Sequence, residues 1–134
     1  MRAVLDPNVL IAALLSPGGA PAQIVSRWLA GEFELIVSES VLTELERAMT
    51  YPRVRSRIAD ADAAAFIDLL RDAAILAQEP PEVPRRSADP GDDYLLALAE
   101  QERAVLVSGD QHLLSLKREL PVTTPREFYE QLPE

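Results

Sequence analysis

Short apolar runs alternate along the chain with longer stretches in which apolar residues recur every three or four positions. Such short runs favour buried strands, and recurrence at helical spacing favours amphipathic helices. The predicted strands are residues 2–5, 33–37, 74–77, 104–107 and 121–123. The predicted helices are residues 9–15 and 24–29, a segment between Ser38 and Pro52, residues 61–76, a segment from Pro90 onward, residues 113–116, and a segment from Pro125 onward. Strands that alternate with helices predict an α/β protein with a mainly parallel sheet.

Polar residues mark where these helices begin and where the chain leaves regular structure. Asp89 is suited to an N-cap, Pro90 to the first helical position, and Asp92 would complete an acidic version of the capping box. The run 124–127 has the residues of a cap for the last helix. Residues 79–86 are rich in proline and charge and predict a loop, and residues 53–57 are a charged segment.

Composition limits the kind of protein that this pattern can form. The chain has 134 residues, of which 48% are hydrophobic, and no cysteine. A chain of this length buries about two thirds of its unfolded surface, so we expect a single domain over residues 1–134 with a core that needs no disulfide. No apolar run reaches the roughly 18 residues of a membrane span, and the absence of cysteine suits a reducing compartment. We therefore expect a cytoplasmic protein without membrane association.

Carboxylates stand where the strands of such a sheet end. Asp6 and Asp110 follow predicted strands, Asp93 lies in the first turn of a predicted helix, and Glu44 lies early in the helix after the second strand. Parallel strands end on one edge of the sheet, where the following helices begin, so these four acids converge. Turns and caps also explain Asp6 and Asp110. Helical spacing does not separate Glu44 from Glu46, because each lies about 100° from the centre of the apolar stripe.

Acids gathered on one edge have a chemical consequence. Neighbouring carboxylates repel one another, and a divalent cation commonly relieves that repulsion. A site made of carboxylate oxygens, without cysteine or histidine, favours Mg²⁺ or Mn²⁺. The sequence therefore predicts a site for such an ion at the edge that these acids share.

The residues around the four acids resemble the acidic motifs of PIN-domain ribonucleases, and most closely the branch formed by toxins of toxin-antitoxin systems. The motifs are VLDPNVLIAA, VSESVLTELERAM, DPGDDYLLALA and AVLVSGDQHLL, in this order over nearly the whole chain. The resemblance implies a three-layer α/β/α sandwich and Mg²⁺- or Mn²⁺-dependent cleavage of RNA with one or two ions. It implies metal-binding and catalytic roles for Asp6, Glu44, Asp93 and Asp110, and supporting roles for Asn8 and Asp92. It also implies an antitoxin partner and a homodimer.

Two features depart from that pattern. Pro7 stands where the family more often has a small hydroxyl residue or another flexible one. The net charge of −9 argues against a broad basic surface, so any RNA contact must be local. The cations considered for that contact are Arg53, Arg55 and Arg57 beside Tyr51, with Arg85, Arg86, His112 and Arg118 as further candidates. Each of these is also explained as an ordinary solvated side chain.

Two other functions fit the same pattern of acids. A phospho-accepting or phosphatase α/β domain also gathers acids around Mg²⁺, but it needs a lysine just after a late strand. Lys117 is the only lysine of the chain and follows the predicted helix 113–116 instead. A PIN-like module that binds a partner without catalysis is the second alternative, and the presence of all four acids argues against it.

Overall fold

The computed structural model describes residues 1–133 and contains one five-stranded parallel sheet. The strands are β1 (Arg2–Leu5), β2 (Glu34–Val37), β3 (Ile75–Leu76), β4 (Val105–Val107) and β5 (Val122–Thr123). Their order across the sheet is β3-β2-β1-β4-β5, and each neighbouring pair is parallel. The predicted α/β class with a parallel sheet is confirmed. Every predicted strand is present, β1 with the predicted bounds and the other four with slightly shorter ones.

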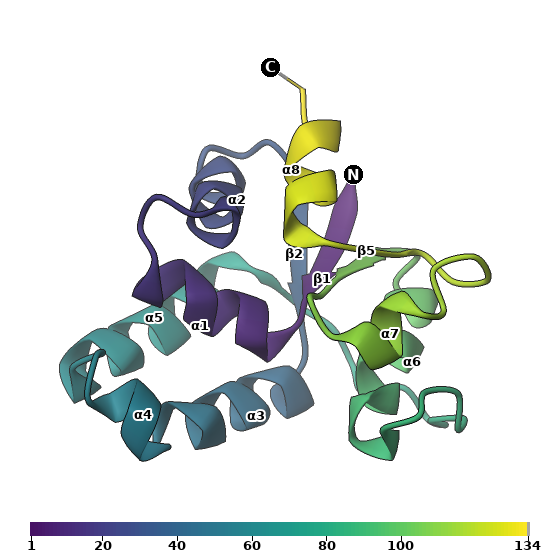
Figure 1. The fold of residues 1–134 in the computed structure, drawn as a ribbon, viewed down its shortest axis with the longest axis horizontal. Helices are drawn as coiled ribbons and strands as arrows, with labels where there is room; N and C mark the ends of the chain where they lie inside the picture. The colour runs from purple at the N-terminus through teal and green to yellow at the C-terminus, as the bar shows by residue number, and fades with distance from the viewer. Residues whose placement is uncertain (134) are drawn as a thin grey trace.

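Helices flank the sheet and connect its strands (Figure 1). The α-helices are α1 (Pro7–Leu15), α2 (Ala20–Leu29), α3 (Glu39–Met49), α4 (Pro52–Arg55), α5 (Asp60–Ala73), α6 (Asp93–Gln101), α7 (Gln111–Leu114) and α8 (Pro125–Gln131), with a 3-10 turn, η1 (Pro90–Asp92), before α6. Helix α1 packs against α2 and α3, α5 packs against α3, and α6 packs against β1 and β4. Arg53 and Arg55, predicted only as part of a charged segment, belong to helix α4.

The core follows from near-continuous apolar strands, as expected for strands covered on both faces. In β1 the last three residues are buried, and the same holds for β2. The edge strand β3 has only two residues, and both are exposed. Short edges of this kind limit pairing with other chains. The central strands therefore form a rigid base for the residues that follow them.

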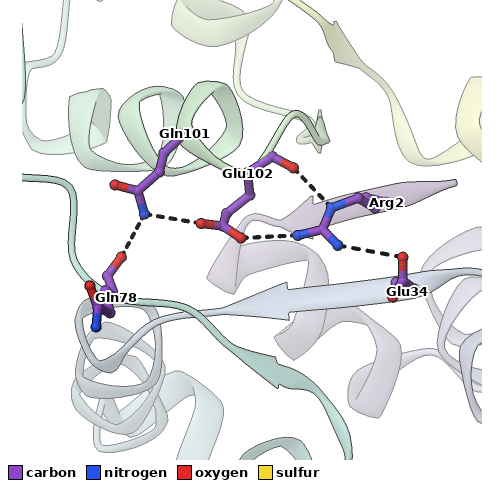
Figure 2. Close-up of polar contacts among 5 residues, drawn as sticks. All are labelled: Arg2, Glu34, Gln78, Gln101 and Glu102. Atoms are coloured by element: carbon purple, nitrogen blue, oxygen red, sulfur yellow. Dashed lines mark hydrogen bonds and ion pairs between the residues drawn. The ribbon is translucent and has the colours of Figure 1, made fainter.

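A polar network holds the start of β1 to neighbouring elements, away from the end that carries Asp6 (Figure 2). The Arg2 guanidinium donates to the backbone oxygen and the carboxylate of Glu102, each at 2.9 Å, and pairs with Glu34 of β2 at 3.5 Å. Gln101 donates to the backbone oxygen of Gln78 at 2.7 Å and to Glu102 at 3.1 Å. These contacts join β1, β2 and the end of α6.

The strand order places the chain reversal between β1 and β4. The chain proceeds from β1 outward through β2 to β3, then crosses back to β4 and continues to β5. In open α/β sheets, ligands bind beyond the carboxyl ends of the strands at such a reversal. The residues after β1 and β4, which begin with Asp6 and Ser108, therefore occupy the position where a site is expected.

Candidate active site

Asp6 joins the end of β1 to helix α1. Its backbone N–H donates to Val107 O of β4 at 3.0 Å, and its Oδ1 accepts from the N–H of Asn8 at 3.0 Å, which caps α1. Pro7 occupies the first turn of that helix, where a missing N–H is harmless. Pro7 is thus compatible with the turn despite its departure from the family pattern. Asp6 is only 4% exposed, so its carboxylate is fixed by its surroundings.

Ser108 connects the acids that follow β1 and β4. Its hydroxyl donates to Asp6 Oδ2 at 2.7 Å and accepts from the N–H of Asp110 at 3.0 Å. Asp110 in turn caps α7, because its Oδ1 accepts from the N–H of His112 at 2.8 Å. Ser108 is fully buried. Sequence reasoning did not single out Ser108, and its place between a buried strand and Asp110 was the available signal.

Asp92 and Asp93 are adjacent in sequence but their side chains have different surroundings. Asp93 is 2% exposed, and its Oδ1 accepts from the backbone N–H groups of Ser87 at 2.8 Å and Arg86 at 3.3 Å. It therefore ties the start of α6 to the preceding loop. Asp92 lines a cleft with Asp6, Glu44 and Asp89, whereas Asp93 and Asp110 are not among its lining residues. The role that the sequence predicted for Asp93 stays a prediction, and these surroundings add Asp92 as a candidate for it.

The turn around these residues also differs from the predicted capping box. Asp89 is an N-cap, but its side chain accepts from the N–H of Gly91 at 3.0 Å and caps the 3-10 turn η1. Helix α6 begins only at Asp93, so Asp92 is not its third residue. The predicted acidic box is therefore wrong at this helix. The box at α8 does form, with reciprocal hydrogen bonds between Thr124 and Glu127 at 3.1 Å each.

Electrostatics link the acids of the cleft. Burial, followed by the hydrogen bond and the charge of Asp110, raises the pKa of the Asp92 carboxyl to about 7. The same hydrogen bond holds the pKa of Asp110 below its usual value. Burial raises the pKa of Asp6, and the charges of Asp110 and Glu44 raise it further. Opposite shifts in the pKa of Asp92 and of Asp110 are typical of two closely spaced carboxyl groups.

Glu44 and Glu46 lie in different depressions of the surface. The acidic cleft, with a volume of about 410 Å³, is lined by Glu44 together with Asp6 and Asp92. Glu46 lines a groove between α3 and α5 instead. Glu44 also forms an ion pair with Arg47, which lies one turn further along α3. The three-dimensional arrangement thus distinguishes two glutamates that helical spacing left equivalent.

The donors in this cleft match a hard divalent cation in chemical type. Its acids are Asp6, Glu44, Asp89 and Asp92, and within residues 1–133 the Oδ2 atoms of Asp92 and Asp93 are both buried without a hydrogen-bond partner. No three His, Asp or Glu side chains among those residues already stand at ligand spacing. Asp6 Oδ2 accepts from the Ser108 hydroxyl, and Glu44 is paired with Arg47. The residues fit Mg²⁺ or Mn²⁺ by chemistry, and binding would require Glu44 to leave Arg47.

The cations considered from sequence are scattered. Arg55 pairs with Asp60 at 3.1 Å, and Arg86 pairs with Glu100. Arg85, His112 and Arg118 are exposed, and none of them lines the acidic cleft. Arg53 and Arg57 line a groove between α1 and α4 that adjoins the cleft. The three arginines predicted as one RNA contact are thus divided between two places.

Lys117 has a partner remote from the acids. Its ammonium contacts both carboxylate oxygens of Glu127, at 3.0 and 3.2 Å. It does not line the acidic cleft. A phospho-accepting site needs a lysine beside its acids, so this position argues against that alternative.

These features define the class: a parallel α/β domain with an acidic cleft at the chain reversal. The PIN domain family matches residues 2–112, so the chain belongs to the PIN domain family. The uncharacterized protein MJ1680 from Methanocaldococcus jannaschii is 26% identical over 98% of this chain and 91% of its own length.

Solved structures share the fold at low sequence identity. PAE2754 from Pyrobaculum aerophilum has a TM-score of 0.68 at 18% identity, covering 98% of this chain and 88% of its own. VapBC2 from Rickettsia felis, bound to a DNA fragment from its promoter, has a TM-score of 0.63 at 15% identity, covering 92% and 98%. VapBC-1 from nontypeable Haemophilus influenzae has a TM-score of 0.63 at 17% identity, covering 94% and 99%. The PIN-like fold is therefore established.

Within residues 1–133, no single helix is both long and apolar enough to cross a bilayer. Only α1 and α2 taken together satisfy length and composition, and they meet at an angle of 99°.

Proposed function

We propose that this protein is a metal-dependent endoribonuclease that hydrolyses RNA phosphodiester bonds. The observation that carries the proposal is the cleft lined by Asp6, Glu44, Asp89 and Asp92, with Asp110 close enough to raise the pKa of the Asp92 carboxyl. Folding brings these acids together from four separate segments. Structural roles at turns do not require such a concentration of negative charge, because each cap uses one oxygen of one acid.

Asp6, Glu44, Asp92 and Asp110 would hold one or two Mg²⁺ or Mn²⁺ ions. A bound ion of this kind lowers the pKa of a coordinated water and neutralises charge on the scissile phosphate. In this scheme Ser108 orients Asp6 through the 2.7 Å hydrogen bond, and Asn8 contributes at the rim of the cleft. Asp93 becomes a structural residue that holds the loop 86–87 beside the site.

The biological setting follows from the family resemblance and from the VapBC neighbours. We assign the protein as the toxin component of a toxin-antitoxin system, with a cognate antitoxin as partner and a homodimer as its assembly. Support for this assignment is the shared fold over more than nine tenths of each VapBC chain. Co-expression with the product of an adjacent small reading frame, followed by co-purification, tests it.

Cleavage of RNA by the purified protein tests the proposed activity. We expect cleavage in Mn²⁺ or Mg²⁺, none in EDTA, and a loss of about a hundredfold or more in Glu44→Gln. Glu46→Gln is the matched control, because it removes the same charge from the same helix outside the cleft. Equal losses in the two variants, or cleavage that persists in EDTA, would contradict the proposal. A PIN-like module that only binds RNA would bind it without metal-dependent cleavage.

A further inference from the structure

A groove between α1 and α4 continues directly from the acidic cleft. The cleft and the groove share Asn8, Ala48 and Tyr51 as lining residues. Beyond these shared residues the groove is lined by Arg53 and Arg57 together with the apolar side chains of Ile11, Ala12, Leu15 and Val54. A polymer that crosses the acids can therefore continue into this groove without leaving the surface.

The register of the α4 turn decides which arginines face the groove. Val54 and Ile58 are 7% and 6% exposed and form the inner face, four residues apart. The N–H of Ile58 donates to Val54 O at 2.9 Å, so the helical turn continues to that residue. Residues four apart share a face, which puts Arg53 and Arg57 on one flank and Arg55 on the other. Arg55 accordingly lines the groove between α3 and α5 and pairs with Asp60.

Arg53 and Arg57 are available to an anion. Both are exposed, and neither forms an ion pair with an acid within residues 1–133. Arg57 makes one weak contact, a 3.4 Å hydrogen bond to Leu15 O. In a chain with a net charge of −9, two adjacent arginines without acidic partners form a local site for phosphate.

A second depression that shares Glu44 with the cleft is less favourable to a phosphate chain. It is lined by Glu79 and by Glu39, which pairs with Arg71. Ser40 donates to both carboxylate oxygens of Glu79, at 2.9 and 2.6 Å, which holds this charge in place. Charge complementarity therefore directs a polyanion towards α4.

Tyr51 stands at the junction of the cleft and the groove. Its side chain is 48% exposed, which is unusual for a large aromatic residue next to a buried core. An exposed ring beside arginines is the combination that stacks unpaired bases while cations hold the backbone. A base within a duplex has no free face for such stacking, so the arrangement selects single strands.

We propose that single-stranded RNA runs from the acidic cleft across Tyr51 and along the groove between α1 and α4, with backbone phosphates on Arg53 and Arg57. This inference rests on the proposed ribonuclease function and names the form of its substrate. It also separates Arg55 from the RNA contact, although sequence had grouped it with Arg53 and Arg57.

Binding of a short fluorescent single-stranded RNA to the Asp92→Asn protein in Mg²⁺, measured over a series of salt concentrations, tests the path. Arg53→Ala and Arg57→Ala should each weaken binding and flatten the slope of log affinity against log salt by about 0.7. Arg55→Ala is the matched control and should change neither quantity. Tyr51→Ala should weaken binding about tenfold with an unchanged slope, and Tyr51→Phe should restore it.

Several results would contradict the proposed RNA path. Equal effects at Arg53 and Arg55, or unchanged slopes in both Arg53→Ala and Arg57→Ala, would overturn it. Duplex RNA that binds as tightly as the single strand would also overturn it. Binding of polyglutamate with the same arginine dependence, without RNA binding, would make an acidic protein segment the occupant. Cleavage by the wild-type protein is measured separately, so failure of this path and failure of the nuclease proposal are distinguishable.

Discussion

The contrast between Asp92 and Asp93 gives the sharpest test of the candidate site. Both change from carboxylate to amide in the Asn variants, and both lie at the start of the same helix. Asp92 has acidic neighbours, Asp110 first among them, whereas Asp93 accepts two backbone N–H groups. We therefore expect opposite effects on stability and on the response to metal.

Asp93→Asn should destabilise the protein whether or not metal is present. The amide oxygen can still accept from Ser87 and Arg86, but charge-assisted hydrogen bonds are about twice as strong as neutral ones. A hydrogen bond to a charged group contributes about 1.5 to 3 kcal/mol, so losing half of each of two bonds costs about 1.5 to 3 kcal/mol. In a domain of this size that corresponds to a fall of about 5 to 15 °C in melting temperature. The stabilisation by Mn²⁺ should remain.

Asp92→Asn should behave in the reverse way. It removes repulsion from Asp110, so the metal-free protein should be as stable as the wild type or more stable. For the wild type, Mn²⁺ at about 100 times its dissociation constant adds about 2.7 kcal/mol, or about 10 °C. That shift should be largely absent in Asp92→Asn.

Thermal unfolding followed by circular dichroism, in EDTA and in Mn²⁺, measures the melting temperatures of the wild type, Asp92→Asn and Asp93→Asn. A wild-type melting temperature indifferent to Mn²⁺ would refute the metal site itself. Loss of the Mn²⁺ shift in Asp93→Asn, with the shift intact in Asp92→Asn, would restore Asp93 as the ligand.

Two further predictions concern the carboxyl group of Asp92 and the hydroxyl group of Tyr94. The raised pKa of Asp92 means that the folded metal-free protein keeps a proton between about pH 4 and pH 7 that the unfolded chain releases, so stability should fall as pH rises through this window. Melting temperatures in EDTA across that window should fall for the wild type and stay flatter for Asp92→Asn; a parallel fall in both would refute this origin. Tyr94→Phe removes a buried hydroxyl that has no hydrogen-bond partner within residues 1–133, so it should raise stability by about 1 kcal/mol. A lower melting temperature in EDTA would mean that the hydroxyl is satisfied.

Hydrophobic periodicity was sufficient to predict the strands and the α/β class because the local signals agree with the tertiary structure. The strands 2–5 and 33–37 are short apolar runs, and both become central strands with three buried residues each. Even the two-residue β3 was predicted, as part of residues 74–77. The order of the strands was not predicted, since it depends on which helices cover each face, and single helices do not specify that.

The acids at the strand ends were predictable for a topological reason. Parallel strands require Asp6 and Asp110 to emerge on the same edge, whatever the details of packing. Asp92 and Asp93 were not distinguishable in this way, because the direction of each side chain depends on the residue at which the helix begins. An N-cap at Asp89 would have started a helix at Pro90, whereas the chain forms a 3-10 turn first and α6 begins at Asp93. A change of a few residues in the start of a helix redirects every side chain near it.

A role in a turn and a role in a functional site do not exclude each other at Asp6 and Asp110. At Asp6, Oδ1 caps α1 while Oδ2 accepts the Ser108 hydroxyl at the edge of the cleft. At Asp110, Oδ1 caps α7 while the neighbouring Asp92 carboxyl lowers the pKa of Asp110. A carboxylate has enough lone pairs to serve a cap and a site together. Because asparagine caps helices about as well as aspartate, Asn variants at these positions remove the charge while they preserve the turn. They therefore test the chemistry of the cleft separately from the folding of the chain.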